Sequence, residues 1–240
     1  NHINNRKTEV KMKKYLILII SIIAAINISI AQENESNDSV YKKYLSEQEK
    51  INQSFSEYFY GNYIKIYSLN ENDFVTAIDS LQKIFTEHLA KFEKEYPTFD
   101  KTKLSAESKE IYYYFDKLLV EYPYYHERFT GEKKTINARL DNNLKDFNNP
   151  ELLSINSYVE YLKAFIYYQS KIELEKETYK KLDNQQLNAT LNLIPEYFSN
   201  QNVIDFLKFY YLNKHIDDFG IKNLESIYQN FTMSCKDTSY

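Results

Sequence analysis

The sequence predicts an all-α protein, an irregular antiparallel bundle of about six or seven helices. Glycine and proline are scarce, with three and four residues in a chain of 240, and a sheet-rich domain needs these residues at its tight turns. Apolar residues recur at helical spacing in several segments. No segment alternates with a period of two for long enough to require a sheet.

The strongest helical pattern lies in residues 73–96. Seven apolar residues, spaced three or four positions apart, fall on one helix face: Phe74, Ile78, Leu81, Phe85, Leu89, Phe92 and Tyr96. Asn72 or Asp73 is predicted to cap the start of this helix, and Pro97 is predicted to stop it.

Weaker patterns flank this segment. Residues 41–59 are predicted as a helix that precedes it. Ser105 is predicted to cap the next helix, which should end before Pro123. Residues 124–131 are then predicted to turn, and residues 133–147 to form a polar, weaker helix.

The last third of the chain predicts three or four further helices. Asn149 and Pro150 are predicted to open the first, because proline suits the first helical position. Two apolar rows on this helix imply contact with two neighbours: Ile155, Val159, Leu162 and Ile166 in one, and Tyr158, Tyr161, Phe165, Tyr168 and Ile172 in the other. Pro195 is expected to kink or restart the next helix, Gly220 to end another, and Asn223 to cap the last.

Residues 12–31 are predicted to be a secretory signal peptide that is cleaved after Ala31. Lys13 and Lys14 supply its positive region, residues 15–30 supply its mostly apolar region, and small residues stand before the cleavage site. The mature chain is therefore expected to be exported, to a periplasmic or other extracytoplasmic compartment.

The remaining sequence is divided into four parts. Residues 1–11 are expected to be a non-native extension upstream of the true start, 32–40 a flexible polar leader, and 41–234 the helical domain. Residues 235–240 carry no helix stop and are expected to be a truncated link to a missing C-terminal domain. No apolar run long enough to cross a membrane follows the signal peptide. The formal net charge of −4 is spread along the chain, which argues against nucleic acid or anionic lipid as a partner.

Cys235 is the only cysteine, so no intrachain disulfide and no cysteine-based metal site is expected. A catalytic thiol needs a lowered pKa, from a nearby histidine or cation or from a helix N-terminus. Cys235 instead follows a predicted helix C-terminus, where the helix dipole disfavours a thiolate. It is predicted to be an inert or partly buried thiol.

No other residue is nominated as catalytic, cofactor-binding or metal-binding, and no cofactor is expected. His88, His126 and His215 lack the spacing of a metal site and are predicted to be structural or surface residues. The carboxylates at 173, 175, 177, 217 and 218 are predicted to form a solvated surface. The tyrosine rows at 112–114, 158–168 and 210–211 are predicted to pack in the core, in preference to stacking on sugars or bases.

Residues 210–231, YYLNKHIDDFGIKNLESIYQNF, resemble the helical region ahead of the thioredoxin-like domain in exported TlpA-type thiol–disulfide oxidoreductases, especially those of the Bacteroidetes. In that family an aromatic and aliphatic helix turns at a glycine into x-K-N-x-E-x-x-Y-x-x-F, as residues 221–231 do here. The family's redox centre is W-C-x-x-C. This chain has no tryptophan and no second cysteine, so no catalytic residue carries over.

Two functions from different classes are therefore expected. The first is a non-catalytic helical accessory region of an exported thiol–disulfide oxidoreductase, in a fragment that lacks the C-x-x-C domain and has a thioredoxin-like domain of the parent chain as its partner. The alternative is a self-contained secreted helical module that binds a protein or a glycan. In both cases the chain as given is not expected to be an enzyme.

Overall fold

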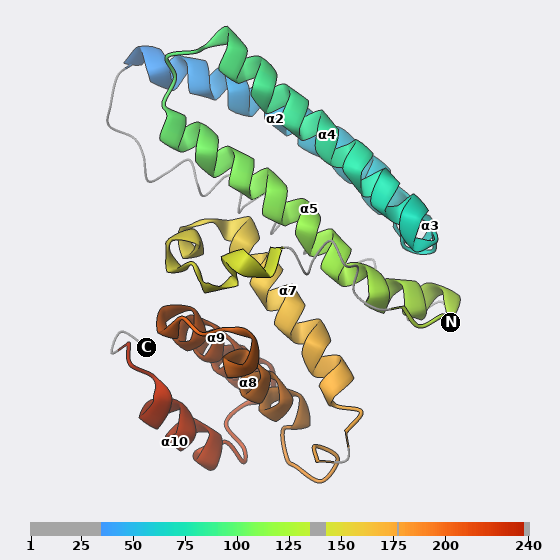
Figure 1. Ribbon diagram of the computed structural model, residues 1–240, viewed down its shortest axis with the longest axis vertical. Helices are drawn as coiled ribbons and strands as arrows, with labels where there is room; N and C mark the ends of the chain where they lie inside the picture. Colours follow the sequence, from blue (N-terminus) through green and yellow to red (C-terminus); the bar gives the residue numbers. More distant parts are fainter. Residues whose placement is uncertain (1–34, 135–142, 177, 238–240) are drawn as a thin grey trace.

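The structure is a computed structural model that describes residues 35–134, 143–176 and 178–237. Every regular element in these ranges is a helix, which confirms the all-α prediction (Figure 1). The predicted upstream extension and signal peptide lie outside the described residues, as does much of the weak helix predicted over 133–147.

The described residues form eight α-helices and two short 3₁₀-helices. In chain order they are α2 (Glu35–Gly61), α3 (Tyr63–Tyr67), α4 (Glu71–Glu95), α5 (Lys101–Thr130), η1 (Asn143–Asn148), η2 (Pro150–Ser154), α7 (Asn156–Glu173), α8 (Gln185–Tyr197), α9 (Gln201–Phe219) and α10 (Glu225–Ser234).

The long helix α5 runs between two groups of helices (Figure 1). On one side α2, α3 and α4 form a group in which α3 and α4 contact α5 directly. On the other side α7 packs against α5, α8 against α7, α9 against α8, and α10 against α9. The main hydrophobic core extends through both groups and includes residues from α2 to α9.

Helix α4 has the predicted buried face. Six of the seven predicted side chains are buried: Phe74, Ile78, Leu81, Phe85, Leu89 and Phe92. The predicted cap is wrong by two or three positions. The Oδ1 atom of Asn70 accepts a hydrogen bond from the Asp73 N–H at 3.0 Å, so the helix begins at Glu71. It ends at Glu95, ahead of Pro97 as predicted.

Helix α2 begins at Glu35 and so extends into residues 32–40, the segment predicted as a flexible leader. The early turns of this helix have apolar neighbours, because Val40 and Tyr41 pack against the main core. The Tyr41 hydroxyl also donates a hydrogen bond to Glu107 of α5 at 2.6 Å. These contacts with residues distant in sequence hold the start of α2 in place, although residues 32–40 are polar in composition.

Two predictions for α5 are wrong. Its cap is Asp100, whose side chain accepts from the Thr102 N–H, and not Ser105. The helix also continues through Pro123 to Thr130, so residues 124–131 are not a turn. Proline removes a backbone hydrogen bond inside a helix. Here the Tyr122 hydroxyl donates to the Leu69 carbonyl at 2.7 Å and so ties this part of α5 to the segment before α4.

The start of α7 also differs from the prediction. Asn149 and Pro150 open the 3₁₀-helix η2, and α7 itself begins six residues later at Asn156. Its own N-cap position makes no side-chain hydrogen bond. Glu110 of α5 takes that role, because its two carboxylate oxygens accept the N–H groups of Asn156 at 2.9 Å and Ser157 at 2.8 Å.

Both predicted apolar rows of α7 contribute to the core. Tyr158, Tyr161, Leu162, Phe165 and Ile166 are buried, and the helix packs on two neighbours, α5 and α8, as its wide apolar face predicts. The second row ends before Ile172, which is 60% exposed.

The ends of the last three helices match the predictions in part. Pro195 lies inside α8, which continues to Tyr197. Gly220 follows α9 with a φ of 81°, the positive φ that glycine adopts without strain, as predicted. Asn223 does not cap α10. Its side-chain amide instead donates to the Asp183 carboxylate at 3.1 Å.

Two tyrosines in the first turns of α7, Tyr158 and Tyr161, provide a test of this core. Both rings are fully buried, but the Tyr158 hydroxyl donates to the Asp146 carbonyl at 2.6 Å, whereas the Tyr161 hydroxyl has no hydrogen-bond partner among the described residues. We expect Tyr158→Phe to lower the free energy of unfolding by about 1 kcal/mol, since it removes a made hydrogen bond. Tyr161→Phe should leave it unchanged or raise it. Urea unfolding measures both, and equal losses in the two variants would contradict this assignment.

Candidate functional site

Cys235 follows the last turn of α10 and is partly buried. Its backbone N–H donates to the Phe231 carbonyl, and its thiol lies 3.3 Å from the Asp237 carbonyl oxygen. Burial, followed by the nearby Asp205 carboxylate, raises the pKa of the thiol. A thiol with a raised pKa is a poor nucleophile near neutral pH, because less of it is ionised.

The three candidate histidines lie in different places. The His88 ring stacks on Tyr44 with centroids 4.9 Å apart, in a small notch between α2 and α4. His126 is buried, with Nδ1 2.9 Å from the Tyr67 carbonyl oxygen. His215 lies against Phe219, and burial lowers its pKa despite the opposing effect of Asp218. Within the described ranges no three His, Cys, Asp or Glu side chains gather as metal ligands.

Three of the candidate carboxylates have lysine partners, and one of them, Glu173, is only 16% exposed. Glu173 pairs with Lys176 at 2.7 Å, Glu175 pairs with Lys133 at 3.0 Å, and Asp218 pairs with a lysine one turn away, at 2.9 Å. The candidate at position 177 lies outside the described residues. Side chains paired in this way on the surface contribute little to stability and show no arrangement for acid–base chemistry.

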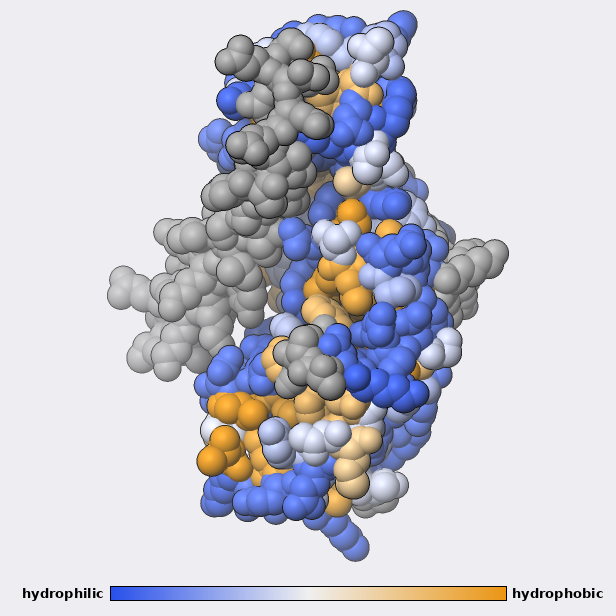
Figure 2. All heavy atoms as spheres, turned by 90° about the vertical axis from the view of Figure 1, so that its left-hand side faces the viewer, coloured by the Kyte–Doolittle hydropathy of each residue, from blue (hydrophilic) through white to orange (hydrophobic). Residues whose placement is uncertain are grey.

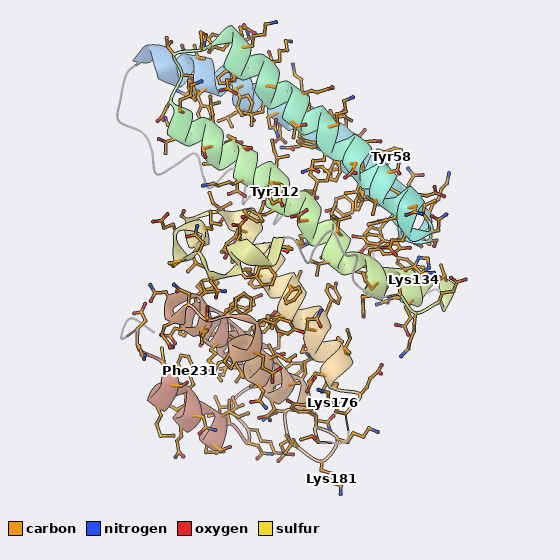
Figure 3. The ribbon with its side chains drawn as sticks, viewed as in Figure 1. Tyr58, Tyr112, Lys134, Lys176, Lys181 and Phe231 are labelled. Atoms are coloured by element: carbon orange, nitrogen blue, oxygen red, sulfur yellow. The ribbon has the colours of Figure 1, made fainter. Side chains whose placement is uncertain are left out.

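Two of the three tyrosine rows have members in the core, whereas both tyrosines of the row at 210–211 are half-buried. Tyr113, Tyr158 and Tyr161 are buried, and Tyr113 also donates a hydrogen bond to the Asp146 carboxylate at 2.7 Å. Other members of the rows, Tyr112 and Tyr210 among them, are half-buried (Figure 3 labels Tyr112 on α5). The rings therefore serve mainly as packing surfaces between helices.

The most unusual cluster in the structure surrounds an ion pair that the sequence analysis did not single out. Lys117 and Glu121 lie one turn apart on α5, with Nζ 2.7 Å from Oε1, and their side chains are only 23% and 13% exposed. Six tyrosines that interact electrostatically with this pair or with each other complete what we call the tyrosine cluster: Tyr60, Tyr63, Tyr67, Tyr114, Tyr125 and Tyr168.

Four helices meet in the tyrosine cluster. Its residues come from the end of α2, from α3, from the middle of α5 and from α7. The rings of Tyr63, Tyr67 and Tyr125 are in mutual contact, with centroids 4.7 to 5.2 Å apart. The Tyr67 hydroxyl also donates to Glu121 at 3.2 Å, so that the ion pair is linked to α3.

Lys117 and the phenols of the tyrosine cluster keep their protonation states near neutral pH. Burial is the largest effect on Lys117 and would lower its pKa, but the attraction and hydrogen bond of Glu121 outweigh it and raise the pKa. Burial raises the pKa of every tyrosine in the cluster. The lysine therefore stays charged and the phenols stay neutral. Such an arrangement holds helices together, and it offers no group poised to exchange a proton.

A signal for this cluster was present in the sequence. Lysine and glutamate four residues apart, with tyrosines one turn before and one turn after them, place charge on a helix face that also carries rings. A second missed residue is Asp205, which is fully buried, although it stands between apolar residues in the segment VIDFL. A carboxylate within such a run indicates a buried polar contact.

The ion pair of the tyrosine cluster can be compared with Lys83–Glu87, which has the same spacing but side chains 71% and 67% exposed. We expect Lys117→Met to lower the free energy of unfolding by about 2 to 3 kcal/mol, because Glu121 loses its partner in a partly buried site. Adding Glu121→Leu should recover much of this loss. Lys83→Met should cost less than about 0.5 kcal/mol. Equal costs for the two lysine variants in urea unfolding would contradict the assigned role.

The buried carboxyl group of Glu107 should make the free energy of unfolding depend on pH. Burial raises its pKa above the usual 4.5, with a smaller contribution from Glu110, although the Tyr41 hydroxyl acts in the opposite direction. The folded protein therefore binds a proton at a pH where the unfolded chain has lost it, and the free energy of unfolding falls as the pH rises through this window.

The Glu107→Gln variant lacks this part of the pH dependence. We therefore expect the free energy of unfolding of Glu107→Gln, minus that of the wild type, to increase as the pH rises from about 4 to about 7. Urea unfolding at several pH values measures the difference, with Glu87→Gln as a control at an exposed site. A difference between Glu107→Gln and the wild type that stays the same at every pH would refute the prediction.

Comparison with protein-family models, with curated proteins and with solved structures finds no match. No residue role is therefore brought to this chain from a relative. Within the described residues, no helix combines the length and the apolar character that crossing a bilayer requires.

Proposed function

We propose that this chain is a non-catalytic helical accessory region of an exported thiol–disulfide oxidoreductase whose redox domain is a separate, thioredoxin-like part of the parent protein. The observation that carries the proposal is the state of the only thiol. Cys235 has no second cysteine to pair with and a raised pKa, so the chain cannot cycle through an intramolecular disulfide. On this proposal, the dithiol chemistry comes from the thioredoxin-like domain of the parent protein.

The resemblance gives the proposal its family. Residues 210–231 span the end of α9, the glycine at 220 and most of α10. The expected change of direction occurs at that glycine, because the Gly220 N–H closes the last turn of α9 on the Ile216 carbonyl and α10 begins five residues later. A helix that ends at this glycine is what the resemblance implies. Export rests on the predicted signal peptide at 12–31.

The purified mature chain should show no dithiol-dependent reduction of insulin, with a thioredoxin as the positive control. The sequence of the gene beyond Tyr240 should encode W-C-x-x-C in a thioredoxin-like domain. A stop codon directly after Tyr240, or a continuation without that motif, would reject the proposal. Reduction of insulin by the chain alone would reject it as well.

A second function, a secreted helical module that binds a protein or a glycan, is favoured by apolar side chains at the surface. Phe219 at the end of α9, Ile221 in the loop that follows and Met233 on α10 are 74% to 77% exposed. Figure 2 shows hydrophobic residues gathered over the lower part of the face it displays, where the α7–α10 group lies. This function requires a ligand-dependent rise in melting temperature, and no rise with extracellular proteins or glycans would count against it.

A further inference from the structure

Helix α10 is attached to the molecule by a small, separate set of contacts. It contributes no residue to the main hydrophobic core. Its three buried apolar side chains, Leu224, Ile227 and Phe231, form a second cluster with Leu187 of α8 and Leu212 of α9. Figure 3 labels Phe231, whose ring lies 6.4 Å from that of Phe209 on α9. Burial of so few side chains provides only a small part of the apolar stabilisation of the fold.

Polar contacts hold both ends of α10. Before the helix, the Asn184 side chain donates to the carbonyls of Lys222 at 3.3 Å and Asn223 at 3.0 Å. After it, the Gln201 side chain lies 3.3 Å from the Ser234 carbonyl, and Lys208 donates to the Ser234 hydroxyl at 3.2 Å. These contacts fix α10 to the turn before α8 and to the start of α9.

Asp205 also holds the second end of α10. It lies on the first turns of α9 and is fully buried. One carboxylate oxygen accepts the N–H groups of Lys236 at 2.9 Å and Asp237 at 3.1 Å, and the other accepts the Gln201 side-chain amide at 2.6 Å. A buried carboxylate needs such donors, and here two of the three belong to the segment that follows α10.

We propose that α10 is a displaceable cover, latched by Asp205, over an apolar strip of α8 and α9. The strip consists of the residues of α8 and α9 that pack in one cluster with α10 and its loop: Leu187, Leu191, Phe209, Tyr211, Leu212 and Ile216. The latch joins the far end of α10 to α9 through two backbone hydrogen bonds. Loss of these bonds leaves three apolar side chains, two side-chain contacts to Ser234 and the turn before α8, so α10 opens as a unit while α2 to α9 keep their shared core.

Native-state amide hydrogen exchange with mass spectrometry tests this proposal, and it does so independently of the proposed function. In the wild type, the amides of α10 and of residues 235–237 should lose protection at a lower urea concentration than the amides of α5 and α7. Exchange of α10 together with α5, in one step, would overturn the proposal.

Asp205→Ala should speed exchange in α10 and in residues 236–237 by at least about tenfold, with α5 and α7 unchanged. Gln201→Ala, which leaves both backbone hydrogen bonds in place, should have a smaller effect in the same direction. Asp218→Ala, on the exposed last turn of α9, is the matched control and should leave α10 as protected as in the wild type. Unchanged protection of α10 in Asp205→Ala, equal loss of protection in all helices, or an equal effect of Asp218→Ala would each refute the latch.

Discussion

The contact between α5 and α7 joins the two groups of helices, and the remaining architecture depends on it. Large rings meet there: Tyr113 of α5 lies against Tyr158 and Tyr161 of α7, with centroids 5.0 and 5.8 Å apart. Each fully buried side chain of this size contributes about 1.5 to 3 kcal/mol relative to an exposed one. Glu110 adds a directional contact, because its two carboxylate oxygens accept the N–H groups of Asn156 and Ser157 at the start of α7. Packing and capping therefore fix the same pair of helices.

Side chains distant in sequence complete several helix ends and connections in this fold. Glu110 caps α7, Asp205 binds the segment after α10, and the Asn148 side chain accepts the N–H groups of Ser199 and Asn200 before α9. In the tyrosine cluster, Glu121 likewise joins two helices, because it accepts a hydrogen bond on α5 from Tyr67 of α3. These contacts are structural, which agrees with a chain proposed to support another domain or to bind a partner. A helical region that supports another domain or binds a partner depends on a defined shape more than on a reactive side chain.

The helices with a regular apolar face were predictable from sequence, and the polar contacts between helices were not. The row from Phe74 to Phe92 predicted α4 because its spacing alone defines a buried face. Pro123 was interpreted as a helix end, since local propensity says nothing about the Tyr122 and His126 contacts that hold α5 on both sides of it. The tyrosine cluster combines residues from four helices, so its position follows only from the packing of those helices.

Pulse-labelling hydrogen exchange of the wild-type protein in increasing urea tests most directly whether the α5–α7 contact makes one unit of α2 to α9. If the two groups share a core, amides of α4 and α7 lose protection at the same urea concentration, in one cooperative transition. Loss of protection in α2, α3 and α4 at a distinctly lower concentration than in α7 and α8 would show two independent units and would contradict the account.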